Sequence, residues 1–302
     1  MIDGHTKLYG LLAHPAAHSL SPLIHNTSFD VTGINGIYLA FDVTSAGLAD
    51  SLAAMRAMHI GGFNLSMPLK TDVLPLLDEI TPRAERLQSV NTVINRDGKL
   101  IGDSTDGQGW VDALKQDNIA IDEAVVTVLG AGGAGRAIIS AAVDAGAKQV
   151  YVFKRTNDLF DARREQLESW SDVVKVLPYE DESLIEKAFS ESRIIANATN
   201  IGMAGGQSLP VGEGAMAQLT PQHVVSDAIY FPLEIPFIRA AKKRHCHTYN
   251  GIGMLVNQAA GSFLEWTGQR MPTVPVIQAV HQAMIDRQLE VVLSRLSPPE
   301  NR

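Results

Sequence analysis

The clearest hydrophobic pattern in the chain is a buried strand followed by a glycine-rich turn and an alanine-rich helix. Residues 125–129 are all apolar or β-branched, which predicts a strand buried on both faces. The turn at 130–135 reads Gly-Ala-Gly-Gly-Ala-Gly, and a helix over 136–145 separates it from a second strand at 149–153. In this strand–turn–helix–strand context, the glycine spacing predicts dinucleotide binding rather than a turn that serves packing alone.

Strands and helices alternate on both sides of this unit, which predicts an α/β fold with a parallel sheet. After the unit, strands are expected at 173–177, 193–197 and 224–228, with helices at 161–170, 183–190 and 235–244. Before it, strands are expected at 7–12, 37–41 and 62–66, with helices at 22–29 and 46–58. Asp97-Gly98 predicts a β-hairpin between these early strands and the glycine-rich turn.

The two ends of the chain are expected to form one domain. Helices predicted over 253–267 and 276–296 follow the alternating region and should return to the first strands. We therefore expect a doubly wound Rossmann dinucleotide-binding domain at 108–252, inserted into a discontinuous α/β substrate-binding domain formed by 1–107 and 253–302. The functional site is expected in the cleft between them, and 298–302 is expected to be a disordered tail.

Composition narrows the class of protein further. The chain has 302 residues, 45% hydrophobic and 19% charged, as in globular proteins. Its formal net charge of -8 argues against binding to nucleic acid or to acidic membranes. We expect a cytoplasmic protein without signal peptide or membrane span. Cys246 is the one cysteine, and with His245 and His247 it lacks zinc-ligand spacing, so we expect a strand start there and no metal site.

Two polar residues are candidates for proton transfer in redox chemistry. Lys70 is expected in a loop after a strand end, and Asp106 in a loop before a helix over 108–116. Both could point into the cleft, although a surface lysine and a helix-capping aspartate are the simpler interpretations of each residue alone. Ser21 can equally cap a helix or contact a ligand, whereas the sequence suggests no structural role for Ser19.

Eight motifs in order carry a resemblance to the shikimate dehydrogenase family over about residues 7–285. They are His18-Ser19-Leu20-Ser21-Pro22 with His25-Asn26, Asn64-Leu65-Ser66-Met67-Pro68-Leu69-Lys70, Val90-Asn91-Thr92, Gly102-Asp103-Ser104-Thr105-Asp106-Gly107, the glycine turn with Arg136, Asn197-Ala198-Thr199 with Gly202, Asp227-Ala228-Ile229-Tyr230 with Pro232, and Gly251-Ile252-Gly253-Met254-Leu255 with Gln258. The resemblance implies an NAD(P)-dependent enzyme of shikimate metabolism, in chorismate and aromatic amino acid biosynthesis, acting as a monomer or a homodimer.

The resemblance also implies roles for individual residues. Lys70 and Asp106 would be the catalytic pair. The expected substrate ligands are Ser19, Ser21, Ser66, Asn91, Tyr230 and Gln258. The expected cofactor contacts are Gly130, Ala131, Gly132, Gly133, Ala134, Lys154, Arg155, Thr156, Asn157, Asp158, Asn197, Thr199, Asn200, Ala228, Ile229, Tyr230, Phe231, Gly251 and Met254.

Substrate and cofactor preference stay open at this point. Ser66 stands where many family members carry threonine, which is similar to the quinate/shikimate dehydrogenase branch and implies quinate as a second substrate. Lys154 and Arg155 favour the 2′-phosphate of NADP, whereas Asn157 or Asp158 would suit the 2′-hydroxyl of NAD, and Arg155 could instead stack on adenine.

Three alternatives remain beside this main hypothesis. The first is a strict NADP-dependent shikimate dehydrogenase, and the second is an amino-shikimate relative. The third, from another class, is a catalytically silent dinucleotide-binding regulator on the same fold. The presence together of Lys70, Asp106, Asn91 and Gln258 argues against the third.

Overall fold

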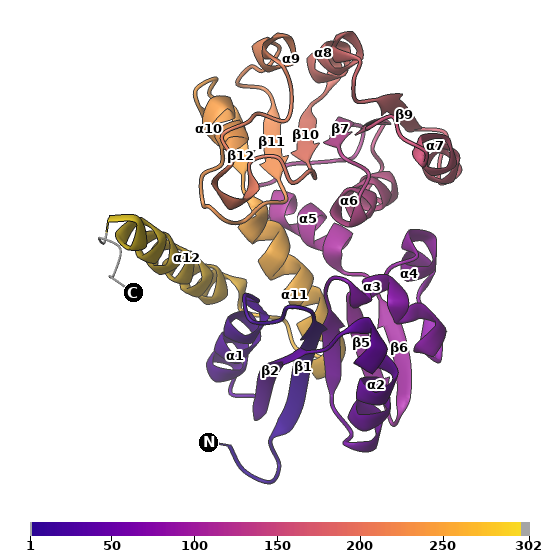
Figure 1. Ribbon diagram of the computed structural model, residues 1–302, viewed down its shortest axis with the longest axis vertical. Coiled ribbons are helices and arrows are strands. Elements are labelled where there is room, and N and C mark those ends of the chain that lie inside the picture. The colour runs from indigo at the N-terminus through magenta and orange to yellow at the C-terminus, as the bar shows by residue number, and fades with distance from the viewer. Residues whose placement is uncertain (1, 297–302) are drawn as a thin grey trace, which may run out of the picture.

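The computed structural model describes residues 2–296 and contains two separate six-stranded sheets (Figure 1). In sheet order, the strands of the first are β2 (Gly36–Asp42), β1 (Lys7–Ala13), β3 (Gly62–Leu65), β5 (Thr92–Arg96), β6 (Lys99–Asp103) and β4 (Glu79–Ile80). Strand β1 pairs in parallel with β2 and β3, whereas β5 is antiparallel to β3 and β6. The helices within this region are α1 (Ser21–Thr32), α2 (Leu48–Ala57), α3 (Leu69–Asp72) and α4 (Pro82–Leu87).

The second sheet is entirely parallel. In sheet order its strands are β12 (His247–Tyr249), β11 (Val224–Asp227), β10 (Ile194–Asn197), β7 (Val125–Leu129), β8 (Gln149–Lys154) and β9 (Val174–Pro178). The chain enters at β7 in the middle, runs to β9 at one edge, and returns to fill the other edge. This is the doubly wound Rossmann order, and it confirms the predicted fold class. Its helices are α6 (Gly133–Asp144), α7 (Phe160–Glu168), α8 (Glu182–Glu191), α9 (Glu213–Ala217) and α10 (Pro236–Lys242).

Two helices, α5 (Asp106–Lys115) and α11 (Gly251–Thr267), join the sheets and cross each other closely. A Cβ atom on Gly109 would lie 2.5 Å from the backbone nitrogen of Gln258 and 2.7 Å from the carbonyl oxygen of Met254. Because these are backbone atoms that cannot move aside easily, only glycine permits this approach. The crossing brings the first turn of α5 beside the middle of α11.

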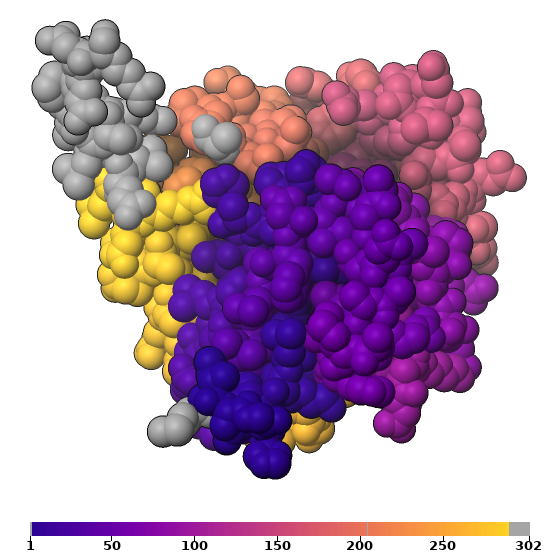
Figure 2. Space-filling view, turned by 60° about the horizontal axis from the view of Figure 1, so that its bottom comes forward, coloured from indigo at the N-terminus to yellow at the C-terminus, as the bar shows by residue number. Residues whose placement is uncertain are grey.

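Each sheet buries its own apolar residues. The central strands β7 and β10 of the second sheet carry Val126, Val128 and Ile194 without exposed surface. The last helix, α12 (Thr273–Leu296), packs beside α1 on the first-sheet side (Figure 2). Within residues 2–296, no helix combines the length and apolar character needed to cross a membrane.

Several sequence expectations differ from the structure. Lys70 lies in the short helix α3 rather than in a loop, and Asp106 is the first residue of α5 rather than part of the preceding loop. Ser21 does not cap its helix: α1 already begins at Ser21, and the residue at the capping position, Leu20, makes no side-chain hydrogen bond. The tail predicted at 298–302 lies outside the described residues.

Candidate active site

Lys70 and Asp106 meet where the first sheet ends and α5 begins. The Nζ atom of Lys70 donates a hydrogen bond to Oδ2 of Asp106 at 2.6 Å. Both side chains are partly buried, with exposed fractions of 27% for Lys70 and 18% for Asp106. The two candidates that the sequence separates by 36 positions therefore form one ion pair that solvent and ligands can still reach.

Asn91, the residue just before strand β5, holds this pair in place. Its Nδ2 group donates to Oδ1 of Asp106 at 2.8 Å and to Oε1 of Gln258 at 3.0 Å. Its Oδ1 atom accepts a hydrogen bond from the backbone N–H of Thr105 at 2.8 Å. One buried amide thus connects the first sheet with both joining helices, so Lys70, Asp106, Asn91 and Gln258 form a continuous polar cluster.

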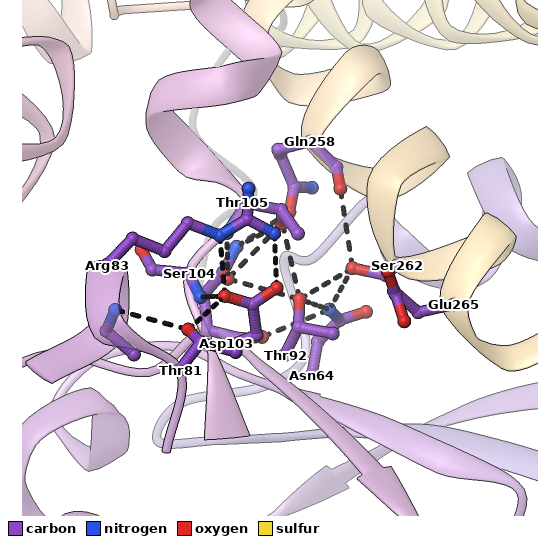
Figure 3. Close-up of polar contacts among 12 residues, drawn as sticks. Asn64, Thr81, Arg83, Thr92, Asp103, Ser104, Thr105, Gln258, Ser262 and Glu265 are labelled. Atoms are coloured by element: carbon purple, nitrogen blue, oxygen red, sulfur yellow. Dashed lines mark hydrogen bonds and ion pairs between the residues drawn. The ribbon is translucent and has the colours of Figure 1, made fainter. Parts of the chain in front are cut away.

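A second group of polar side chains, Asn64, Thr92 and Ser262, lies next to Gln258 (Figure 3). Nδ2 of Asn64 donates to Oγ of Ser262 at 3.0 Å and to Oγ1 of Thr92 at 3.2 Å. The hydroxyls of Thr92 and Ser262 are 2.6 Å apart, and Tyr38 donates to Oδ1 of Asn64 at 2.8 Å. All of these groups are buried, and their mutual hydrogen bonds offset the cost of removing them from water.

The end of strand β6 is fixed by a buried carboxylate, that of Asp103 (Figure 3). Asp103 accepts hydrogen bonds from Oγ1 of Thr81 at 2.6 Å and from Nε of Arg83 at 2.6 Å. Burial alone would raise the pKa of Asp103, but the Arg83 guanidinium and the Thr81 hydroxyl outweigh it and hold the pKa below its usual value. This ionised anchor lies three residues before Asp106 and so helps to position it.

Two predicted substrate residues at the start of α1, Ser19 and Ser21, share a local contact. Oγ of Ser19 accepts a hydrogen bond from the backbone N–H of Ser21 at 3.1 Å, so Ser19 has the structural role that the sequence did not reveal. Ser66 follows the last residue of β3, and its backbone N–H is held by the carbonyl of Leu12 at the end of β1. Tyr230 comes from the loop after β11 yet packs against the apolar cluster around α1 and α11.

The glycine turn has the shape that a pyrophosphate needs. Gly130 adopts a φ of +96°, which L side chains rarely adopt, and a Cβ on Gly135 would lie 2.0 Å from the carbonyl oxygen of Gly130. A Cβ on Gly132 or Gly133 would meet no protein atom within 4 Å, so these positions border open space. Helix α6 begins at Gly133, and its free backbone N–H groups favour an anion there. The turn therefore fits a dinucleotide.

Known proteins share this arrangement of sequence and structure. The family models "Shikimate dehydrogenase substrate binding domain" and "Shikimate 5'-dehydrogenase C-terminal domain" match residues 11–93 and 251–281. The chain is 40% identical over 280 residues to shikimate dehydrogenase (NADP(+)) from Streptococcus thermophilus, covering 92% of this chain and 96% of the relative. The chain belongs to the shikimate dehydrogenase family. It is therefore an NAD(P)-dependent oxidoreductase.

Two solved structures of the family show the same fold. Shikimate 5-dehydrogenase from Listeria monocytogenes, in complex with shikimate and NAD, has a TM-score of 0.88 at 37% identity, covering 92% of this chain and 98% of that one. Quinate dehydrogenase from Corynebacterium glutamicum, in complex with NAD, has a TM-score of 0.82 at 26% identity, covering 92% and 99%. These similarities extend over both sheets, so they concern the whole chain and not the dinucleotide-binding part alone.

In this family member, hydrogen bonds from Lys154 hold the loop after β8 together. Nζ of Lys154 donates to Oδ1 of Asn157 at 2.6 Å and to the carbonyl oxygen of Arg155 at 3.1 Å. Partial burial and two neighbouring arginines lower the pKa of Lys154. Lys154, which the sequence predicts to favour NADP, and Asn157, which it predicts to favour NAD, are thus hydrogen-bonded to each other.

A buried amide–carboxyl pair organises the ends of β10 and β11. Nδ2 of Asn197 donates to Oδ2 of Asp227 at 2.6 Å, and Oδ1 of Asn197 accepts from the hydroxyl of Thr199 at 2.7 Å. The backbone N–H of Ile229 donates to Oδ1 of Asp227 at 2.8 Å, while burial raises the pKa of Asp227 to about 7. The other expected cofactor residues lie in the turns and first helical turns at this same edge: Ala131, Ala134, Asp158, Asn200, Ala228, Phe231, Gly251 and Met254.

Some polar residues around the site were not identified from the sequence. Asn64 and Thr92 stand inside recognised motifs, and the position of Asn64 in a buried strand is the signal that could have singled it out, because a buried amide needs partners. Ser262 lies on α11 outside every motif, and only the crossing of α11 over the first sheet brings it to Thr92.

Proposed function

We propose that this protein catalyses reversible hydride transfer between NAD(P) and the ring hydroxyl of shikimate, with 3-dehydroshikimate as the oxidised product. The observation that carries the proposal is the Lys70–Asp106 ion pair, held by Asn91 and Gln258 in a partly exposed cluster. In this proposal, 1–107 with 253–302 forms the substrate-binding domain, and 108–252 forms the dinucleotide-binding domain.

Proton transfer is assigned to the Lys70–Asp106 pair. Bound NAD(P)+ supplies a hydride acceptor, so the protein must remove the proton from the hydroxyl that becomes a ketone. Nζ of Lys70 donates a hydrogen bond to Oδ2 of Asp106 at 2.6 Å, so the two groups are placed to act together on the substrate hydroxyl. Asn91 donates to the second carboxylate oxygen of Asp106 and so restricts how the carboxylate can turn.

Substrate binding is assigned to short polar side chains around this pair. A polyhydroxylated acid needs several donors and a cation, and Lys70 has two further N–H groups beyond the one given to Asp106. The remaining ligands in the proposal are Ser19, Ser21, Ser66, Asn91, Tyr230 and Gln258. Tyr230 comes from the loop after β11 and packs against the apolar residues around α1 and α11, which supports the proposal that both domains enclose the substrate.

Cofactor binding is assigned to the edge of the second sheet where its strands end. The pyrophosphate would lie on Gly130, Gly132 and Gly133 at the start of α6, where the structure leaves open space and free N–H groups. The loops after β8, β10 and β11 would hold the adenosine and nicotinamide ends. We propose that both NAD and NADP are accepted.

Quinate is a second candidate substrate because of one residue. Ser66 lacks the methyl group of the threonine that many family members carry at this position, and in the proposal this difference admits the additional ring hydroxyl of quinate. The similarity to the quinate dehydrogenase from Corynebacterium glutamicum is consistent with this extension.

A panel of substrates tests the proposal. Shikimate, quinate and their amino analogues are supplied to the purified protein with NAD+ or NADP+, and absorbance at the NAD(P)H band is followed. We expect reduction with shikimate and a slower reduction with quinate. Dinucleotide binding without turnover on any of these acids would instead identify a silent dinucleotide-binding regulator.

A further inference from the structure

The loop after β8 binds the carboxylate of Glu180, which lies just after the neighbouring strand β9. The backbone N–H of Thr156 donates to the two carboxylate oxygens of Glu180 at 3.0 and 3.2 Å, and its hydroxyl donates to Oε2 at 2.7 Å. Glu180 follows β9, whose last residue Pro178 pairs with Lys154 at the end of β8. The contact therefore lies at the edge of the sheet where the strands end, and it was not identified from the sequence.

In a Rossmann sheet, the loop after the second strand contacts the 2′ position of the adenosine ribose. In such sheets an acidic residue near this point binds the 2′-hydroxyl of NAD, or an arginine accommodates the 2′-phosphate of NADP. A phosphate dianion is bound by backbone N–H groups, hydroxyls and arginine. In this chain the N–H and hydroxyl of Thr156 are already donated to Glu180.

The charges around Thr156 are also distributed unevenly. Lys154 is engaged with Asn157 and lies 5.6 Å from the ring centre of Phe160. Arg155 has no side-chain hydrogen bond or ion pair in the described part of the chain, which makes it the cation available in this loop. Hydrogen bonds from Thr156 hold the pKa of Glu180 below its usual value, so its carboxylate is charged at neutral pH.

We propose that Glu180 determines how this protein discriminates between NAD and NADP. Its carboxylate uses the Thr156 donors that a 2′-phosphate would need, and its negative charge repels that phosphate. Two donors leave lone pairs of the carboxylate free, and the 2′-hydroxyl of NAD can donate to them. Glu180 thus takes the part of the acidic residue that usually follows the second strand, while Arg155 keeps NADP binding possible.

The inference rests on the proposed function, because it concerns the cofactor of the same reaction. Asp158 was the acidic residue that the sequence offered for the 2′ position. It lies in the same loop and is exposed, and it makes no hydrogen bond to Thr156. Asp158→Asn is therefore a matched control that removes one negative charge from the loop and leaves the Glu180 contact in place.

The test measures binding of two adenosine fragments without any turnover. Adenosine 2′,5′-bisphosphate and 5′-AMP are titrated by calorimetry into wild type, Glu180→Gln and Asp158→Asn at neutral pH and fixed salt. Glutamine keeps an oxygen that can accept from Thr156, so the loop should retain its position. We expect Glu180→Gln to improve the binding of the bisphosphate relative to 5′-AMP by about tenfold, with a smaller change in the control.

The outcomes separate this inference from the proposed function. If wild type binds both fragments and Glu180→Gln leaves their ratio unchanged, or shifts it no more than Asp158→Asn does, the role of Glu180 is refuted and the proposed function stands. If wild type binds neither fragment nor either dinucleotide, the proposed function fails and the inference fails with it. In steady-state kinetics, the same variant should raise kcat/KM for NADP+ relative to NAD+.

Discussion

Replacement of Asp106 by asparagine removes a charge and also creates a conflict between donors. Oδ2 of Asp106 accepts from Lys70 and Oδ1 accepts from Asn91, at 2.6 and 2.8 Å. Asparagine offers one oxygen and one NH₂ group in the same space. Whichever way it is oriented, its NH₂ group faces either the Lys70 ammonium or the Asn91 amide, so one of the two contacts must be lost.

The expected loss follows from these two contacts. A polar group left without its partner in a buried setting costs about 1–3 kcal/mol, and partial exposure of this pair places the loss of stability near the lower end. Removal of a positioned acid–base group lowers the rate by about 10²–10⁴-fold. We therefore expect Asp106→Asn to fold, with kcat/KM for shikimate reduced by about 10²–10⁴-fold.

The assay compares kcat/KM, dinucleotide affinity and thermal stability in four variants: Asp106→Asn, Lys70→Ala, the double variant and the control Asp112→Asn. Asp112→Asn makes the same chemical change on the same helix, away from Lys70, and should behave as wild type. The double variant Asp106→Asn with Lys70→Ala should lose less than the product of the two single losses, because the residues act as one unit. Near-wild-type turnover in Asp106→Asn, or strictly multiplicative losses in the double variant, would refute the reasoning.

Further predictions concern packing, pH and domain movement. Gly109→Ala should lower both stability and activity, because its Cβ would lie 2.5 Å from the backbone of Gln258; a melting temperature equal to that of wild type would contradict the close crossing. Burial lowers the pKa of His25 from 6.5 to about 3. Between these pH values His25 binds a proton in the unfolded chain but not in the folded protein. The free energy of unfolding should therefore decrease as pH falls from 6.5 toward 3. Urea denaturation across this pH range should show a smaller decrease in the free energy of unfolding for His25→Leu than for wild type. An equal pH dependence in the two proteins would exclude His25 as the cause. Finally, Gln108 on α5 and Gly253 on α11 lie where the chain passes between the two proposed domains. If the domains close there, hydrogen exchange around Lys70 and Asp106 should slow when cofactor and substrate bind together; unchanged exchange would exclude closure.

The elements that sequence patterns predicted well are those with buried, periodic residues. Strand β7 is a continuous run of apolar and β-branched residues, and the glycine turn after it needs a φ that only glycine adopts readily. Strand β4 has two residues and helix α3 has four, so neither is long enough to show a period. Asp106 could not be placed on α5 from the sequence, because the helix begins there without a side-chain cap.

Contacts between distant segments were beyond sequence reasoning. Ser262 meets Thr92 across 170 positions, and Glu180 meets Thr156 across 24 positions. Both contacts depend on how helices and strands pack, which local residue patterns do not encode. The Lys70–Asp106 contact differs from these, because the resemblance to the family already implied that the two residues form a pair.

The most direct measurement compares wild type with Lys70→Ala in one preparation. Shikimate-dependent reduction of NAD+ and NADP+ is recorded, and dinucleotide affinity is measured in the same samples. We expect wild type to reduce at least one cofactor, and Lys70→Ala to lose at least about 10²-fold in turnover with unchanged dinucleotide affinity, because Lys70 lies on the first-sheet side of the molecule. Absence of shikimate oxidation by wild type, or near-wild-type turnover in Lys70→Ala, would contradict the account.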